Sequence, residues 1–186
     1  MLAAVAVARQ VGGNYPGRRT PRARRQEASG KGDAVDAAAE LEAIRRVKYA
    51  YFRTLDLKRF DELGQLLTVD ATAAYEDGRT RLDGRDAIVA WLSEVLGDPG
   101  IATEHHGHHP EIELTSESTA EGTWYLQDRV IVPAADLEIG GTAIYEDRYR
   151  LTPEGWRIAH TGYMRVFEEH RTHSTLALRS FSSRFA

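Results

Sequence analysis

Four strand-like segments fill the second half of the chain, and only short turns separate them. The segments span residues 109–118, 119–133, 138–152 and 155–167, and turn-forming residues occur at 116–118, 133–136 and 153–155. Neighbouring strands that are joined by such short turns must run antiparallel. The second half therefore predicts a long antiparallel meander, and the apolar face of this sheet needs a cover from the first half.

The first half carries helical patterns that can supply this cover. Apolar residues recur at spacings of three and four along residues 36–56, which predicts a helix with an inward stripe of Leu41, Ile44, Val47, Tyr51 and Leu55. A second, short helix is predicted over residues 56–67, a hairpin with its turn at Asp77 and Gly78 over residues 69–84, and a third helix over residues 84–97. Helices followed by a meander indicate an α+β fold with the helices on one face of the sheet.

Charge divides the chain into two unequal parts. Residues 1–32 hold seven basic residues against one glutamate and carry +6, while the whole chain of 186 residues carries −4, so residues 33–186 carry −10. We interpret residues 1–35 as a disordered basic extension, residues 36–167 as one folded domain and residues 168–186 as a peripheral tail. The extension is of a kind that can touch nucleic acid or anionic lipid. The acidic remainder argues against nucleic-acid binding by the folded domain.

Composition narrows the setting and the chemistry. The chain has no cysteine, which removes disulfides, thiolate nucleophiles and cysteine-ligated zinc, and fits a reducing cytoplasm. No apolar run approaches the ~20 residues that a membrane helix needs. Residues 1–8 are apolar and end like a secretory cleavage site, yet no basic residue precedes them. We therefore expect a cytoplasmic protein without a membrane partner.

Asp128 lies in the second strand-like segment, residues 119–133, in phase with the apolar residues of that segment. By the period-two rule it shares a strand face with Trp124, Leu126, Val130 and Val132. A carboxylate on an apolar face must be paired, hydrogen-bonded or held neutral, because burying it alone is costly. Asp128 therefore either binds a structural partner or lines a cavity in which chemistry takes place.

A second polar signal is the run of histidines at positions 105, 106, 108 and 109. Strict alternation with Ile112 and Leu114 would place His106 and His108 on the inner face, but a bulge at Gly107 would place His105 there instead. Imidazoles also bind zinc, nickel and copper. Four adjacent histidines at a strand end lack the convergent geometry of a closed metal site, so we expect no metal here.

The third signal lies on the first helix. Tyr51 belongs to its inward stripe, which makes the ring core material, and its hydroxyl lies near the helix end, where a pocket could open. Asp56 follows five residues later, where the helix stops. Asp56 is therefore either a residue of that pocket or an N-cap of the next helix, since aspartate readily caps helices.

These segments together resemble a known family. The stretches AIRRVKYAYFRTLDLKRFDEL, TEHHGHHPEIELTSESTAEGTW and GWRIAHTGYMRV are similar to the SnoaL-like branch of the nuclear-transport-factor-2-like superfamily, which includes scytalone dehydratases, bile-acid 7α-dehydratases and polyketide-cyclase-like proteins. The resemblance spans roughly residues 36–167. It implies a cone in which three N-terminal helices pack on a curved, mostly antiparallel sheet and enclose an apolar pocket, and it implies self-association as a dimer or trimer.

The resemblance also implies a site. Tyr51, Asp56 and His105 match catalytic positions of the dehydratase members, and Asp128 matches that of the bile-acid enzymes, where scytalone dehydratases carry histidine. Tyr75 stands where scytalone dehydratases have another hydroxyl donor, and His106 replaces His105 if the strand register differs. We expect Tyr75 and His106 to bind the substrate, together with Trp124 and Leu126, which share the strand face of Asp128. Leu55 stands where scytalone dehydratases carry a second tyrosine. The Asp–Arg–Asp set of limonene epoxide hydrolases is not recognisable, because Asp128 and Arg129 lie on opposite strand faces.

A histidine paired with an aspartate inside an apolar cone is a reasonable acid–base unit, since imidazole titrates near pH ~6.5. This unit predicts proton abstraction next to a carbonyl, followed by dehydration, isomerisation or cyclisation. The family resemblance and the expected apolar pocket imply a small apolar substrate that is polycyclic, terpenoid-like or polyketide-like. The sequence shows no phosphate-binding glycine-rich loop and no nucleophile elbow, so we expect a lyase or isomerase that needs no cofactor. The alternative is a non-catalytic domain that binds a small ligand or serves association.

Overall fold

The computed structural model describes residues 31–176, 180 and 182–185, so most of the expected basic extension lies outside the described residues. The described helices are α2 (Lys31–Asp56), α3 (Phe60–Gly64) and α4 (Arg85–Leu96). The described strands are β1 (Leu67–Tyr75), β2 (Thr80–Asp83), β3 (Ala102–Leu114), β4 (Thr119–Val132), β5 (Leu137–Thr152) and β6 (Gly155–Thr172). Two 3-10 turns, η2 (Pro133–Ala135) and η3 (His173–Thr175), follow β4 and β6. The predicted order of helices, hairpin, helix and meander is confirmed.

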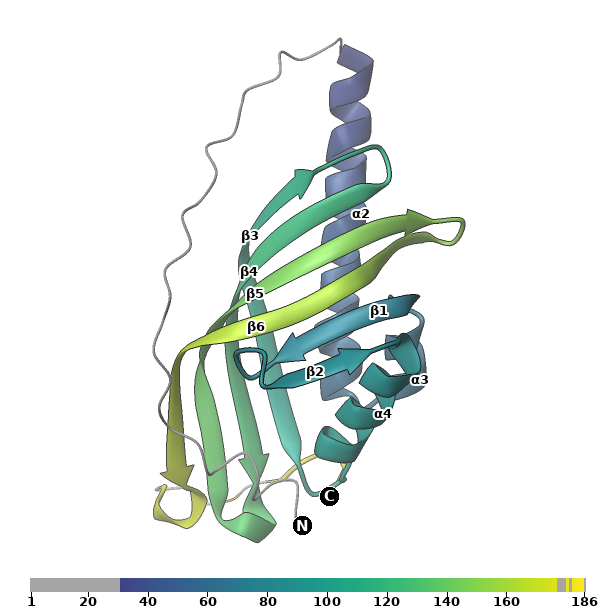
Figure 1. Ribbon diagram of the computed structural model, residues 1–186. Helices are drawn as coiled ribbons and strands as arrows, with labels where there is room; N and C mark the ends of the chain where they lie inside the picture. Colours follow the sequence, from purple (N-terminus) through teal and green to yellow (C-terminus); the bar gives the residue numbers. More distant parts are fainter. Residues whose placement is uncertain (1–30, 177–179, 181, 186) are drawn as a thin grey trace.

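The strands form one six-stranded sheet in the order β2-β1-β6-β5-β4-β3. Every neighbouring pair is antiparallel except β1 and β6, which run parallel and pair Ala73 with Thr161. The long strands β3 to β6 bend strongly, so the sheet curls into an open cone (Figure 1). The sheet is therefore curved and mostly antiparallel, as expected for this α+β fold.

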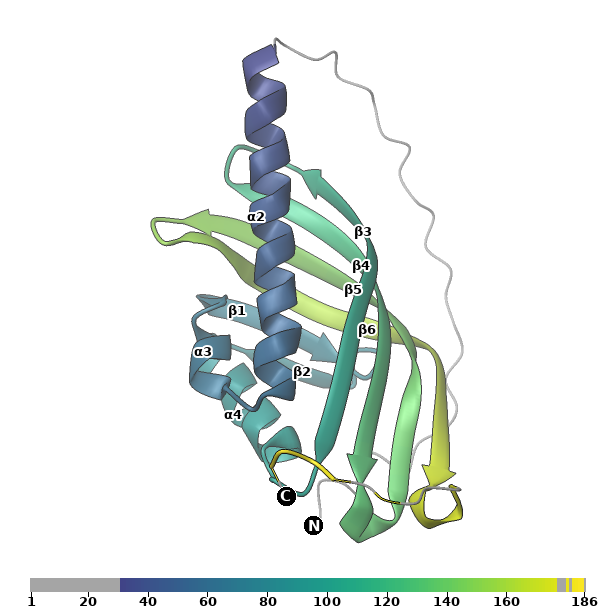
Figure 2. The same ribbon diagram turned by 180° about the vertical axis from the view of Figure 1, so that it is seen from behind.

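The helices cover the hollow side of this sheet. α2 runs along the concave face, and α3 and α4 pack beside its end near β1 and β2 (Figure 2). Of the predicted inward stripe, Ile44, Tyr51 and Leu55 are fully buried, while Leu41 and Val47 are half-buried. Lys48, Phe52 and Thr54 are buried as well, so α2 buries residues beside this stripe that the sequence pattern did not assign to the inner face.

The inner face of β3 is set by a bulge, but not at Gly107. The register of β3 against β4 shifts between His108 and Glu111, where His109 has a positive φ of 47° and Pro110 lacks an N–H for the ladder. The shift places His105 on the inner face and His106 on the outer one. Gly107 has another role: a Cβ there would clash with the Phe52 ring, so only glycine lets β3 approach α2 so closely.

β6 continues five residues past the domain boundary expected at Phe167. Its last part pairs with the start of β5, where Gly141 lies opposite Glu168 and Leu137 opposite Thr172. The apolar alternation stops at Phe167 because the following side chains form ion pairs instead of packing in a core. Among the described residues, no helix combines the length and the apolar character that crossing a membrane requires.

Candidate active site

A cavity of about 140 Å³ lies between α2, α4 and the inner face of the sheet. Apolar side chains form most of its wall: Leu55, Leu92, Val95, Leu96, Ile101, Leu126, Val130, Val132, Leu137 and Ile139. Polar side chains enter the same space from five strands and a helix, among them Tyr51, Tyr75, His105, Asp128, Tyr145 and Arg165. The cavity thus brings together five of the eight predicted site residues, namely Tyr51, Tyr75, His105, Leu126 and Asp128.

The carboxylate of Asp56 hydrogen-bonds to His105 and so fixes the orientation of its ring. The ring Nδ1 of His105 lies 2.6 Å from Oδ1 of Asp56, and the backbone N–H of His105 donates to Oδ2 at 3.0 Å. The hydroxyl of Thr103 donates to Oδ1 at 2.9 Å. Three contacts from β3 therefore fix the Asp56 carboxylate, and the carboxylate fixes the imidazole of His105. The side chain of His105 is only 9% exposed.

The local backbone explains why Asp56 can do this. α2 ends at Asp56, and the chain then turns at Lys58, whose φ is 56° and whose ammonium group donates to the carbonyl of Leu96. The alternative of helix capping is wrong, because α3 begins at Phe60 after Arg59, and no side chain caps it. The last residue of α2 is thus directed across to β3.

The ring of Phe52 packs against one face of the His105 imidazole. The two rings are stacked with 7° between their planes and 6.3 Å between their centroids. Phe52 can occupy this position because Gly107, two residues along β3, leaves the space open. The imidazole is therefore held at Nδ1 by a carboxylate and on one face by an aromatic ring, with its edge at the cavity.

Four tyrosines gather at another wall of the cavity. The hydroxyls of Tyr51 and Tyr75 are 2.8 Å apart, and the rings of Tyr145 and Tyr163 contact each other edge to face. Burial raises the pKa of each phenol, to about 12 for Tyr163, so all four stay protonated at neutral pH. Trp91 of α4 stacks on Tyr75 and fixes its ring. These hydroxyls are neutral hydrogen-bond groups facing a mostly apolar space.

Asp128 is paired with an arginine that the sequence analysis did not single out. Nη1 and Nη2 of Arg165 on β6 donate to its two carboxylate oxygens at 2.5 and 2.7 Å. Burial acts to lower the pKa of Arg165, but the hydrogen bonds to Asp128 outweigh it and raise that pKa. Arg165 reaches Asp128 across β5 because Gly141 lies between these two residues and has no side chain. A Cβ at position 141 would be only 3.4 Å from Nη1 of Arg165. A possible signal was the Gly140–Gly141 pair together with Arg165 in phase with Tyr163.

Two predicted site residues lie elsewhere. His106 points away from the cavity on the outer face of the sheet, where its side chain is 53% exposed and contacts Glu104 at 3.0 Å. Trp124 is fully buried but does not line the cavity, because its indole N–H donates to the hydroxyl of Tyr149 at 2.9 Å. The period-two rule placed Trp124 on the correct face but could not give its depth along the cone.

A buried ion pair lies behind the tyrosine wall. Nζ of Lys48 is 2.7 Å from Oδ2 of Asp147, and both side chains are fully buried. The ammonium group also sits 3.5 Å from the ring centroid of Tyr145 and 4.9 Å from those of Tyr51 and Phe52. Within the part of the chain that the structure describes, no three histidine, aspartate or glutamate side chains converge as ligands of a metal ion.

Comparison with known proteins places this geometry in context. A family model described as the SnoaL-like domain matches residues 36–162. The uncharacterized protein Rv2910c of Mycobacterium tuberculosis is 25% identical over 127 residues, which are 68% of this chain and 85% of that protein.

Solved structures agree on the fold. A candidate scytalone dehydratase from Novosphingobium aromaticivorans superposes with a TM-score of 0.68 at 20% identity, over 73% of this chain and 90% of that one. The type 3 hexachlorocyclohexane dehydrochlorinase LinA from Novosphingobium barchaimii gives a TM-score of 0.69 at 14% identity, over 81% and 99% of the two chains. At these identities the likeness shows a shared fold and leaves the chemistry to be argued from the site.

Proposed function

The chain belongs to the SnoaL-like domain family, and we propose that it is a lyase or isomerase in which His105 acts as the general base on a small ligand held in the cavity. The observation that carries this proposal is the fixed pair of Asp56 and His105 at the cavity wall. No step of the proposed reaction requires a group that the chain does not supply itself.

The contacts of His105 define which of its nitrogens can act. A carboxylate can only accept a hydrogen bond, so Nδ1, which faces Asp56, carries the hydrogen. Nε2 then carries the lone pair and can take a proton from a ligand. When it does so, the positive charge that forms on the ring lies 2.6 Å from the Asp56 carboxylate and is stabilised there.

Tyr51 and Tyr75 supply the complementary function. The hydroxyl of Tyr51 is hydrogen-bonded to that of Tyr75 and also to that of Tyr145, so two hydrogen bonds among three hydroxyls leave one hydrogen for a ligand oxygen. Donation to a carbonyl oxygen stabilises the negative charge that develops there when the neighbouring carbon loses a proton. The cavity therefore offers a base and a donor at the same ligand, as an enolising reaction needs.

A β-hydroxy ketone illustrates the complete step. Nε2 of His105 takes a proton from the carbon next to the carbonyl, and the C–H electron pair forms an enolate whose oxygen accepts from a tyrosine hydroxyl. The enolate then expels the β-hydroxyl group, which takes the proton back from the imidazolium and leaves as water. Two of the similar structures are named as a dehydratase and a dehydrochlorinase, which are names of eliminations and support this class of reaction.

The first prediction tests the base. On 3-hydroxycyclohexanone as probe, replacing His105 by Ala should lower the rate of enone formation and of α-proton exchange in D₂O by about 10²–10⁴-fold. Asp56→Asn should also lower both rates, because it removes the charge that stabilises the imidazolium. Ultraviolet absorbance follows the enone, and proton NMR follows the exchange.

His106→Ala is the matched control, since it removes an adjacent imidazole that points away from the cavity. It should leave both rates unchanged. If the His105 variant folds and keeps the wild-type rates, the assignment of the base is wrong.

A non-catalytic ligand-binding function is the second candidate. It is supported by the mutual pairing of the site's polar groups, Tyr51 with Tyr75 and Asp128 with Arg165. A wild-type protein that binds the probe, as seen by NMR line broadening, yet exchanges none of its α-protons would favour this candidate over the enzyme.

A further inference from the structure

We propose that the cavity selects neutral ligands of about one ring and rejects their anionic counterparts, because Arg165 is already neutralised by two carboxylates. This inference deepens the proposed function and rests on it only in taking the same cavity as the ligand site. A buried arginine in a cavity is ordinarily the group that captures a carboxylate or a phosphate. Here its pairing removes that capacity.

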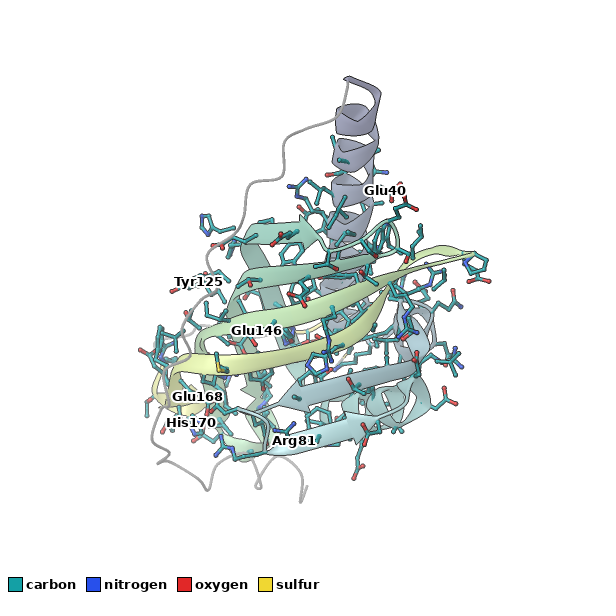
Figure 3. The ribbon with its side chains drawn as sticks, turned by 45° about the horizontal axis from the view of Figure 1, so that its top comes forward. Glu40, Arg81, Tyr125, Glu146, Glu168 and His170 are labelled. Atoms are coloured by element: carbon teal, nitrogen blue, oxygen red, sulfur yellow. The ribbon has the colours of Figure 1, made fainter. Side chains whose placement is uncertain are left out.

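The contacts of Arg165 carry the argument. Its two terminal nitrogens bind both oxygens of Asp128, whose side chain is 5% exposed, and its Nε lies 3.1 Å from Oε2 of Glu168. The other oxygen of Glu168 is 2.7 Å from Nε2 of His170. Glu168 and His170 lie close together near the end of β6 (Figure 3). Arg165, Asp128 and Glu168 together carry a net charge of −1, and protonation of His170 would bring the group only to neutrality.

The rest of the lining does not reverse this balance. The cavity's second cation, Arg79, donates to the carbonyl of Glu76 and lies 3.9 Å from Asp77. Two arginines therefore face three lining carboxylates, those of Glu76, Asp128 and Glu168. Asp56 adds a further negative charge behind His105. An anion entering this space meets a negative potential in a poorly solvated site, which costs binding free energy.

Neutral ligands meet the opposite situation. The four lining phenols remain protonated because burial raises their pKa, so they donate to or accept from an uncharged oxygen without a change of charge. Apolar side chains form most of the remaining wall. The site thus favours binding of a neutral molecule that carries one or two oxygens on an apolar frame.

The volume of the cavity limits the size of the ligand. The volume of about 140 Å³ is close to the roughly 150 Å³ of an engineered protein cavity that holds one benzene molecule. One six-membered ring with small substituents therefore fills the enclosed space. A polycyclic substrate, which the family resemblance implied, would have to leave part of its frame outside.

Benzamide and benzoate test this directly, because they share one shape and differ in charge. Wild-type protein should bind benzamide about 100-fold more tightly than benzoate, as measured by calorimetry at fixed salt and neutral pH. In the double variant Asp128→Asn, Glu168→Gln the guanidinium group loses both counter-charges. The preference should then reverse, with benzoate gaining affinity by at least about 100-fold.

Two single variants serve as controls for the double variant. Glu168→Gln alone, at the end of β6, should gain about tenfold for benzoate and provides the test if the double variant does not fold. Glu104→Gln removes one carboxylate from the outer face and should change neither affinity. Equal wild-type affinities for the two probes, or no gain for benzoate in the Glu168 variant, would overturn the proposal.

This result is separable from the catalytic one. His105→Ala should keep the preference for benzamide, since His105 takes no part in the charge balance around Arg165. A protein that distinguishes the two probes but turns over no substrate would retain the inference and lose the enzyme. The reverse pattern, turnover with equal binding of both probes, would do the opposite.

Discussion

At the scale of single residues, Lys48 is the side chain whose surroundings are least expected. It lies on α2 four residues after Ile44 and is completely buried, with Asp147 as its counter-charge and three aromatic rings around it. Burial lowers the pKa of Lys48, and the nearby Asp147 partly opposes this. Asp147 also accepts from the hydroxyl of Tyr149, which accepts from Trp124. The pair thereby ties α2 to β4 and β5 behind the tyrosine wall.

We predict that Lys48→Met destabilises the protein by about 3–5 kcal/mol, because it leaves the Asp147 carboxylate buried without a counter-charge. Urea unfolding followed by circular dichroism gives the free energy. The double variant Lys48→Met, Asp147→Asn should recover much of the loss. Arg46→Met, which breaks an exposed ion pair with Glu42 on the same helix, is the control and should cost far less. Equal losses for the Lys48 and Arg46 variants would mean that the buried pair has no special weight.

Periodicity alone could not have identified Lys48. The pattern of α2 assigned the inward position of that turn to Val47, which is only half-buried, and lysines are almost never fully buried unless paired. Its partner lies on β5, about a hundred positions away in the chain, so the pairing depends on tertiary contacts. Tyr51, Asp56 and His105 were recognisable because their spacing resembles that of a family, which the residue types alone would not have supplied.

At the scale of secondary structure elements, the two glycines of β5 determine how its neighbours meet. Gly141 separates Asp128 on β4 from Arg165 on β6, and a Cβ there would clash with the carbonyl oxygen of Phe167. A Cβ at Gly140, on the outer face, would have its nearest neighbour at 3.7 Å, which is an ordinary contact. Adjacent glycines in one strand are thus expected to differ in their tolerance to substitution.

Gly141→Ala should destabilise the protein by roughly 1–3 kcal/mol, because the backbone of β6 must move to admit the methyl group. It should also disturb the pairing of Arg165 with Asp128 and weaken the discrimination against benzoate. Gly140→Ala, the adjacent control, should leave both properties near wild type. Denaturant unfolding and benzoate titration measure the two effects. Identical behaviour of the two variants would contradict the role assigned to Gly141.

The elements themselves were largely predictable, but their pairing was only partly so. Alternation and turn residues gave β4 and β5 almost to the residue, because each strand's pattern is local. The parallel pairing of β1 with β6 joins segments that are far apart in the chain, and no local pattern encodes it. The bulge at His109 and Pro110 was expected at Gly107, since a glycine can mark either a bulge or a close approach, and here it marks the contact with Phe52.

At the scale of the whole molecule, the described helices α2, α3 and α4 leave one face of the sheet uncovered. Tyr125, Ile144 and Met164 are register partners across β4, β5 and β6 on this face, and Tyr125 and Met164 are 46% and 42% exposed. Figure 3 shows Tyr125 on the side of the sheet turned away from α2. The outward charges beside this row are mixed in sign, since Glu121 on β4 is the register partner of Arg148 on β5. An exposed apolar row on an uncovered sheet face is a surface that a second copy of this chain can cover.

We therefore expect self-association through this face, and predict that Tyr125→Lys combined with Met164→Lys shifts the protein towards monomer. Sedimentation equilibrium gives the mass of each variant. Tyr49→Lys is the matched control, because Tyr49 is an equally exposed tyrosine, at 45%, but lies on α2. A wild-type protein that sediments as a monomer, or a double lysine variant that keeps the wild-type mass, would rule out this interface.

The position of β6 in the sheet has a consequence for how the molecule is made. β6 is the strand through which the β2–β1 pair joins the β5–β4–β3 meander, yet among the described strands it leaves the ribosome last. Until it emerges, the strand that carries Tyr75 has no sheet pairing that connects it to the strand that carries Asp128, and both keep apolar surface in water. Co-translational folding can therefore prepare two half-shells but cannot close the cone, and a nascent chain stalled before β6 would be a substrate for chaperones.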